Sequence, residues 1–325
     1  MTDIQPETTW HERFTQTLGS SGFDSELKRL QPDAPRELYH YTSGVGLKGI
    51  VESRTLWASS ATFLNDEVEL THADTILAGI RQEVAGASDA LSVREFCERS
   101  ARIELSSFAR GFGAFVACFC EEADLLSQWR GYGLGGFSIG FDTPNWTSPE
   151  PARGEPAPIM VLLRVEYHEQ EQGRIVRAVV EPLVEALTAE ERAYGRDYVI
   201  AECVAPALEV LHQTLWTTAL WFKHPRFSEE REWRLVVIQD ETQYIPNVTP
   251  GPRPLRTSVR PAPFGFVPYI ELPIATSPRP PIRNVLVGPS PRPDLARRGV
   301  NALLQLSELR NDGVRINTSS VPLRT

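Results

Sequence analysis

The sequence has few cysteines, and their spacing predicts neither cross-links nor a metal site. Four cysteines stand among 325 residues, at positions 97, 118, 120 and 203. None forms a C-x-x-C pair, and no cysteine and histidine lie at zinc-ligand spacing. A chain of this length buries enough apolar surface to fold without disulfides. We therefore interpret Cys118 and Cys120 as small buried hydrophobes on one strand face.

Long apolar runs and an excess of basic charge are also missing. No run approaches 18 apolar residues, so we expect no membrane-spanning helix. The polar start, MTDIQPETTWHERF, has no apolar core of the kind found in signal peptides, so we expect a cytoplasmic protein with no membrane partner. With 33 Lys and Arg against 42 Asp and Glu, the formal charge is −9. This charge argues against a chain wrapped in nucleic acid, although it is compatible with a local basic groove.

Several well-known catalytic and nucleotide-binding motifs are absent. The sequence contains no G-x-S-x-G, no H-E-x-x-H and no Walker pattern. The glycine cluster GYGLGG is no G-x-G-x-x-G fingerprint and does not lie between a strand and a helix, which excludes a Rossmann site. No internal repeat occurs at a fixed period.

What is present indicates a globular α+β protein. Hydrophobic residues make up 41% of the chain and charged residues 23%. Residues 1–35 are expected to be a polar lead-in with at most one helix, and residues 36–325 a single α+β domain with helical insertions. Strands and helices do not alternate regularly, which argues against a doubly wound sheet. The expected strands cover 37–42, 55–61, 113–120, 137–142, 159–167, 233–239, 268–274, 284–287 and 313–321, and the expected helices 43–51, 66–84, 92–108, 175–187, 190–221 and 294–309.

His40 is the first candidate for chemistry. It stands in YHYTS at the end of a strand, where binding groups are often displayed, with Tyr41 and Thr42 beside it. Alternation places His40 on the face opposite Tyr39 and Tyr41. Two interpretations stay open: a ligand-positioning donor beside a stacking platform, or a strand histidine satisfied within an aromatic core.

Two further segments follow. In TFLND, Asn65 and Asp66 stand where a helix begins, so Asp66 is explained by capping, while Asn65 is left free for ligand contact. In SQWRGYGLGGFSIGF, Arg130 offers a planar fork to phosphate oxygens, and Tyr132 can stack on a flat ring. The alternative for the second segment is an ordinary turn with an exposed Arg and a Trp packed beneath it.

The segment EEREWRL places acidic residues at the start of a strand. If pairing begins near Glu230, then Glu230, Glu232 and Arg234 share one face. A carboxylate beside an Arg stays ionised, which suits the stabilisation of a developing cation. The alternative is a solvated sheet edge that carries an ion pair.

The segments LYHYTS, FLNDEVE, SQWRGYG–FSIGFD and EEREWRLV resemble, in order and over about residues 38–288, a widespread uncharacterised bacterial domain family. The layout is also similar to ADP-ribosyltransferases. That resemblance implies a mixed, largely antiparallel split sheet with inserted helices, NAD as substrate, and no metal. It implies that His40 holds the NAD ribose and that Glu232, or Glu230, is the catalytic carboxylate. In that superfamily an aromatic or hydroxyl residue on a middle strand supports the nicotinamide. The candidates for this role here are Ser138, Tyr41 and Tyr132.

The function predicted from these residues is cleavage of the nicotinamide–ribose bond of NAD. This step builds positive charge at C1′, which a fixed carboxylate stabilises, and Arg130 would neutralise the pyrophosphate. The protein would be a toxin or defence effector whose acceptor is nucleic acid, protein or a small molecule. Two alternatives stay open: a nucleotide sensor without chemistry, or a nuclease-type hydrolase that uses Glu230, Glu232 and Asp66. The enzyme hypothesis requires His40, Arg130 and Glu232 to line one cleft.

Overall fold

A computed structural model describes the conformation of most of the chain. The described residues are 8–63, 67–105, 112–132, 136–143, 159–240, 255–263, 265–274, 282–307, 309 and 313–322. They fall into two compact units. Unit 1 comprises Met1–Pro32, Asn65–Arg110 and Glu166–Pro225, and unit 2 comprises Asp33–Leu64, Gly111–Val165 and Arg226–Thr325. The prediction of a single domain over residues 36–325 stays a prediction, because compact units need not fold independently.

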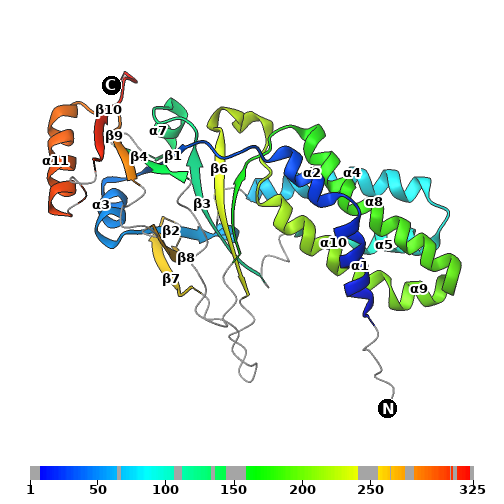
Figure 1. Ribbon diagram of the computed structural model, residues 1–325. Coiled ribbons are helices and arrows are strands. Elements are labelled where there is room, and N and C mark those ends of the chain that lie inside the picture. The colour runs from blue at the N-terminus through cyan, green and yellow to red at the C-terminus, as the bar shows by residue number, and fades with distance from the viewer. Residues whose placement is uncertain are drawn as a thin grey trace, which may run out of the picture. The chain divides into compact units, whose positions relative to one another are not determined.

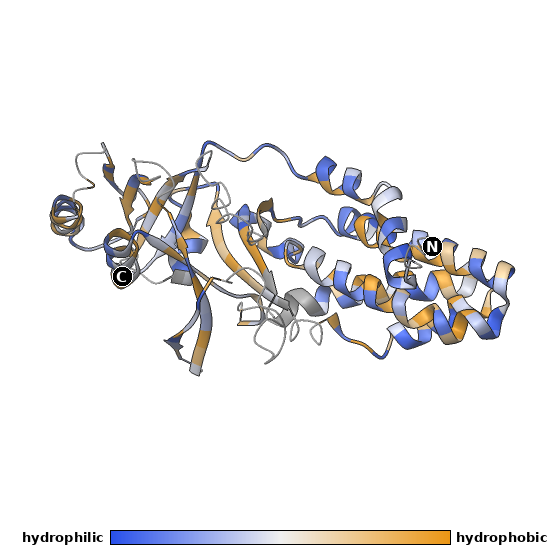
Figure 2. Ribbon diagram, turned by 60° about the horizontal axis from the view of Figure 1, so that its bottom comes forward, coloured by the Kyte–Doolittle hydropathy of each residue, from blue (hydrophilic) through white to orange (hydrophobic). Residues whose placement is uncertain are grey.

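Unit 1 is helical. Its helices are α1 (Trp10–Ser20), α2 (Phe23–Leu30), α4 (Glu67–Ala87), α5 (Leu91–Ser100), α8 (Glu169–Tyr194), α9 (Arg196–Glu202) and α10 (Val204–Ala219). The longest, α8, buries Ile175, Val179, Leu183 and Leu187, which recur on one face of the helix. In Figure 2, bands of hydrophobic and hydrophilic residues alternate along the helices of this unit. Among the described helices, none has both the length and the hydropathy to cross a membrane.

Two expectations for this unit need correction. The polar lead-in contains two helices, and α1 begins with a capping box in which Thr9 and Glu12 bond reciprocally. Phe14 and Leu18 of α1 are buried, and α1 packs on α8 and α10. The helix predicted over 190–221 is interrupted, because Gly195 adopts φ 86° and ψ 153°, outside the helical region.

Unit 2 is built on a sheet of ten described strands. They are β1 (Glu37–Thr42), β2 (Thr55–Ser60), β3 (Phe112–Cys120), β4 (Phe137–Asp142), β5 (Ile159–Arg164), β6 (Glu232–Asp240), β7 (Thr257–Ala262), β8 (Gly265–Pro273), β9 (Ile282–Val287) and β10 (Arg315–Thr318). Strands β9 and β10 pair in parallel, and the other described pairings are antiparallel. The prediction of an α+β protein with a mixed, largely antiparallel sheet is therefore confirmed.

The sheet divides at β3. Strand β6 pairs with β3 over its whole length and so takes one edge of it. The other edge is shared: β1 pairs at Cys120, and β2 pairs at Phe115 and Val116. Because β1 and β2 meet β3 at different places, the sheet forks between them. Strands β9, β4, β1, β3 and β6 lie side by side in this order (Figure 1).

The two faces of the sheet have different coverings. One face, which we call the core face, carries Leu38, Phe119 and Trp233 and packs against α3 (Gly44–Ser53) and α11 (Pro293–Leu306). The other, the α7 face, carries Tyr41 and Cys120, which cluster with Trp129 of α7 (Leu126–Tyr132). Ser43 caps α3, since its hydroxyl accepts a hydrogen bond from the Gly46 amide at 3.1 Å.

Candidate functional site

His40 lies at the fork of the sheet. Its Nδ1 is 2.9 Å from the carbonyl oxygen of Cys118. A carbonyl only accepts, so Nδ1 carries the hydrogen and Nε2 is left as the acceptor of a neutral ring. Burial lowers the pKa of His40, and the hydrogen bond to Cys118 opposes this shift only in part. Among the described residues Nε2 has no hydrogen-bond partner, so a neutral acceptor is held in a fixed orientation.

The fork itself explains the position of this ring. Cys118 lies two residues before Cys120, so its backbone groups point to the same edge of β3, where β1 has already departed. The His40 side chain therefore supplies the hydrogen bond that a strand would have given. It also contacts Phe119, with the ring centroids 5.7 Å apart. The interpretation of a satisfied strand histidine is thus correct for Nδ1, while Nε2 keeps the ligand interpretation open.

The neighbours of His40 have supporting positions. The hydroxyl of Tyr41 donates to the Glu122 carbonyl at 2.8 Å and accepts from the Leu125 amide at 2.9 Å. Burial raises the pKa of this buried phenol. Thr42 packs against Gly46, where a β-carbon would collide with the threonine hydroxyl. Tyr41 therefore ties β1 to the loop over residues 121–125, and its ring offers no open stacking platform.

On α7, Trp129 is buried and Arg130 is exposed, as the turn interpretation expected, although these residues form a helix and not a turn. Trp129 is fully buried, packs edge-on against Tyr41 at 4.7 Å, and donates its indole N–H to Asp124 at 2.8 Å. A β-carbon at Gly288 would lie 2.8 Å from the Trp129 ring, so only glycine fits there. Arg130 is exposed and makes no ion pair with any described residue. The side chain of Tyr132 lies outside the described residues, as do Asn65 and Asp66.

Ser138 lies on the α7 face of β4, opposite Tyr41 on β1 and Leu286 on β9. Its side chain is fully buried, and within the described part of the chain its hydroxyl has no hydrogen-bond partner. Leaving a buried hydroxyl unpaired costs about 1–3 kcal/mol. Ser138 is therefore a buried donor whose hydrogen bond is not supplied by the described residues.

The sequence led us to expect Glu230 and Glu232 on one face of a strand, one period apart. The structure does not place them so. Strand pairing begins at Glu232, because Arg231 adopts a left-handed conformation with φ 42°. Glu230 is the last residue of a 3₁₀ helix, Pro225–Glu230, and so lies outside the strand. The alternation argument fails for Glu230 because one residue with positive φ breaks the extended backbone.

Glu232 and Arg234 share a face, as predicted, and form a buried ion pair. Arg234 Nε lies 2.9 Å from one carboxylate oxygen of Glu232 and Nη2 lies 3.2 Å from the other. Glu232 is 5% exposed and Arg234 2%. The interpretation of a solvated edge is therefore wrong for this pair, since both charges are removed from water.

The strand register separates His40 from Glu232. Tyr39 pairs with Cys120, and Cys120 pairs with Glu232, so these three residues point to the α7 face. His40 follows Tyr39 and leaves the sheet on the core face. Two strand spacings, about 10 Å, separate the backbones at this level. The prediction that His40, Arg130 and Glu232 line one cleft is not supported, because successive strand residues point to opposite faces.

Cys120, between Tyr39 and Glu232, is buried as expected, whereas Cys118 is only half-buried. Burial raises the pKa of the Cys120 thiol to about 12, while a hydrogen bond from the Glu122 amide opposes the shift. The thiol is thus protonated and unreactive at neutral pH. The described residues contain no group of three or more His, Cys, Asp or Glu side chains arranged to hold a metal ion.

The loop over residues 121–125 is a junction that sequence reasoning missed. Glu121 accepts a hydrogen bond from the Trp233 indole at 2.9 Å, and Glu122 pairs with Arg231 at 2.7 Å. Arg231 and Trp233 are the residues directly before and after Glu232 in the chain. Asp124 accepts from Trp129 and from the hydroxyls of Ser319 and Ser320. The signal was present in the sequence, because EEAD places three carboxylates directly after a buried strand.

Electrostatics keeps Asp124 charged in this junction. Burial by itself would raise the pKa of Asp124, but hydrogen bonds from Ser319, Ser320 and Trp129 outweigh it and lower the pKa. Through these bonds the C-terminal residues are tied to α7, and through Tyr41 the same loop is tied to β1. The loop therefore links β1, α7 and residues 319–320 to Arg231 and Trp233, the two residues on either side of Glu232 in the chain.

Comparison with known proteins identifies a family over part of the chain. Residues 128–235 match the model of a family described as a protein of unknown function, DUF2971. This stretch contains Arg130, Ser138, Glu230, Glu232 and Arg234. No curated protein and no solved structure matches the chain. The resemblance to an uncharacterised family is therefore confirmed over residues 128–235.

Proposed function

We propose that unit 2 is an NAD-consuming enzyme of the ADP-ribosyltransferase type, with Glu232 as its catalytic carboxylate. The observation that carries this proposal is the buried carboxylate of Glu232, held at both oxygens by a buried guanidinium on the α7 face of a forked sheet. A charge fixed in this way needs no reorganisation when positive charge develops nearby, so it stabilises a transition state efficiently.

The reaction breaks the bond between the nicotinamide nitrogen and ribose C1′. The bonding electron pair leaves with nicotinamide, and C1′ becomes electron-deficient until an acceptor hydroxyl, amine or water attacks it. With water, the products are nicotinamide, ADP-ribose and one proton. Glu232 would stabilise the positive charge at C1′, and Arg234 would hold the carboxylate in place.

The other candidate groups then fit an extended ligand. Ser138 shares the α7 face with Glu232 and has an unpaired hydroxyl among the described residues, suited to the nicotinamide amide. Arg130 is exposed and without an ion pair in the same part of the chain, which leaves its planar fork for the pyrophosphate. His40 Nε2 would accept from a ribose hydroxyl at the fork. Because His40 and Glu232 leave the sheet on opposite faces, this arrangement replaces the single cleft expected from the sequence. Glu232, Ser138 and Arg130 would act on the α7 side, and the dinucleotide would have to pass through the fork between β1 and β2 to reach His40.

This activity would act in the cytoplasm, where NAD is plentiful, and NAD consumption would suit a toxin or defence effector. The direct test is nicotinamide release from NAD by the full chain, with nucleic acid or protein added as acceptor, together with NAD binding by calorimetry. Release supports the proposal. Binding without release would favour the nucleotide sensor, and the absence of both would refute the proposal.

A further inference from the structure

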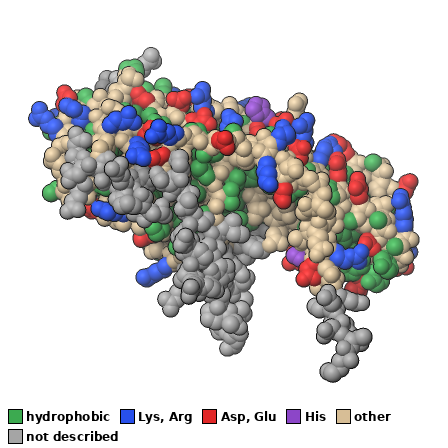
Figure 3. Space-filling view, in the orientation of Figure 1, with side chains coloured by type: hydrophobic (Ala, Val, Ile, Leu, Met, Phe, Trp, Pro, Cys, Tyr) green, Lys and Arg blue, Asp and Glu red, His purple; other side chains and the backbone are tan. Residues whose placement is uncertain are grey.

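A shallow depression lies in unit 1 where α8 ends and α9 begins. Its volume is about 580 Å³, and Asp89, Leu91, Glu191, Tyr194 and Tyr198 are among the residues that line it. Tyr194 is 57% exposed and Tyr198 44%. On the face seen in Figure 3, hydrophobic side chains lie beside acidic and basic ones at this end of unit 1. Exposed aromatic rings that cluster in this way indicate an interaction site.

The two tyrosine rings are held together by the break between the helices. Gly195 leaves the helical conformation, so Tyr194 ends α8 and Tyr198 falls in the first turn of α9, with ring centroids 5.5 Å apart. Trp10 of α1 packs against both, at 6.2 Å and 6.5 Å. The rings are thus supported from behind, and little side-chain entropy remains to be lost on binding.

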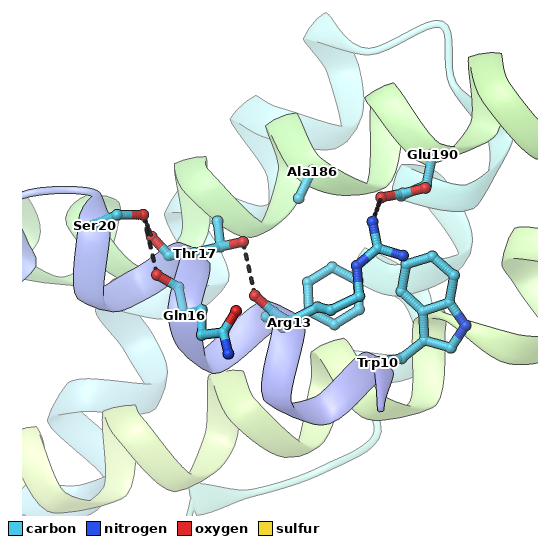
Figure 4. A pocket seen from close by; sticks show the side chains of 8 residues that line it. Trp10, Arg13, Gln16, Thr17, Ser20, Ala186 and Glu190 are labelled. Atoms are coloured by element: carbon cyan, nitrogen blue, oxygen red, sulfur yellow. Dashed lines mark hydrogen bonds and ion pairs between the residues drawn. The ribbon is translucent and has the colours of Figure 1, made fainter. Parts of the chain in front are cut away.

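The chain itself shows what this combination of groups binds. In an adjoining pocket of about 270 Å³, the guanidinium of Arg13 lies 4.0 Å from the centre of the Trp10 ring (Figure 4). The same guanidinium pairs with the Glu190 carboxylate at 2.7 Å. An aromatic face and a carboxylate together hold a guanidinium there, through a cation–π contact and an ion pair.

The depression repeats this pair of features. Its aromatic faces are those of Tyr194 and Tyr198. Three of its lining residues carry carboxylates (Asp89, Glu191 and Asp197), and one, Arg196, carries a positive charge. Arg196 already pairs with Asp197 at 2.8 Å, and Glu191 accepts from the Ser92 amide at 2.8 Å. Asp89 is fully exposed, 4.0 Å from Arg94. The depression is therefore acidic and aromatic, and its charge is complementary to a cation.

We propose that this depression binds an arginine side chain from a basic segment of a partner protein. Arginine fits better than lysine, because its planar group stacks on an aromatic ring while its edge pairs with a carboxylate. The formal charge of −9 favours encounter with a basic partner. Tyrosine and tryptophan are also the residue types that dominate binding energy at interfaces. This inference does not depend on the activity proposed for unit 2.

The test uses the full chain and three labelled peptides that differ at three equivalent positions. The first carries arginine, the second lysine and the third citrulline, which keeps the planar shape of arginine without its charge. Fluorescence anisotropy at low salt should give the tightest binding for arginine and the weakest for citrulline. Tyr198→Ala should weaken arginine binding about fivefold or more, whereas Tyr198→Phe should preserve it.

Phe266→Ala is the matched control, since Phe266 is an aromatic residue 68% exposed in unit 2. It should leave peptide binding unchanged. Melting temperatures of both alanine variants check that folding is intact. Equal binding of the citrulline peptide, no effect of Tyr198→Ala, or no binding of the arginine peptide up to about 1 mM would each overturn the proposal.

Discussion

The guanidinium of Arg234 contacts both carboxylate oxygens of Glu232, two residues earlier on the same strand. Both side chains are almost fully buried. Removing two charges from water is costly, and the attraction between them offsets that cost only when the geometry is good. A pair of this kind adds little net stability, so its presence on the α7 face is better explained by a need for a fixed negative charge.

The first prediction concerns the loss of one partner. Arg234→Met should leave the Glu232 carboxylate buried without its guanidinium and lower the free energy of unfolding by about 3–5 kcal/mol. The double variant Glu232→Gln/Arg234→Met removes both charges and should recover part of that loss. Urea denaturation measures both. A single variant as stable as the double one would contradict the account of a buried ion pair.

The second prediction separates the two roles of His40. Asparagine can donate to the Cys118 carbonyl, as His40 Nδ1 does, but it places no acceptor where Nε2 lies. His40→Asn should therefore stay close to wild type in melting temperature, while His40→Ala should lose stability. Both variants should lose the rise in melting temperature that millimolar NAD gives the wild type. If His40→Asn kept the full NAD effect, the ribose role of His40 would be wrong.

The third prediction concerns acid stability of unit 1. His212 is fully buried, its Nδ1 lies 2.7 Å from the Leu208 carbonyl, and its Nε2 lies 3.4 Å from the Ser100 hydroxyl. Burial lowers the pKa of His212 below its usual 6.5; the Leu208 carbonyl opposes this shift, and the nearby Arg81 adds to it. The unfolded chain therefore takes up a proton more readily than the folded one.

It follows that His212 stabilises the fold above pH 6.5 and that this contribution is lost as the pH falls below 6.5. Melting temperature should drop between pH 7.5 and 5.5. In His212→Gln the drop should be smaller, because glutamine does not titrate. The pKa of His40 is lowered as well, so wild type also loses stability through His40 as the pH falls. The quantity to compare is therefore the drop in melting temperature of the wild type minus that of His212→Gln. Parallel curves for the two proteins would refute the assignment to His212.

Local sequence signals predicted many elements well. The expected strands 37–42 and 137–142 have the same bounds as β1 and β4, because alternation and flanking breakers are local features. The shared face of Glu232 and Arg234 also follows from a period of two. The opposite faces of His40 and Glu232 depend instead on the register among β1, β3 and β6, which pairs residues far apart in the chain.

Two other features were hidden for similar reasons. Nothing in the letters EEREWR marks Arg231 as left-handed, so the start of β6 at Glu232 could not be placed. The fork depends on two strands sharing one edge of β3, which is a tertiary property. The role of Tyr41 as a tie to the 121–125 loop likewise needs the fold, because its partners lie about 80 residues away.

The central claim is that Glu232 supplies the catalytic charge, and Glu230 offers a matched control two residues away. Glu232→Gln and Glu230→Gln each replace a carboxylate with an amide of the same shape. The measurement is the rate of nicotinamide release from NAD by the two variants and the wild type, with NAD binding measured alongside. Glu232→Gln should slow release roughly a hundredfold or more while NAD still binds, and Glu230→Gln should have a small effect. If Glu230→Gln abolished release and Glu232→Gln did not, the assignment would be reversed; release unchanged in both variants would contradict the account.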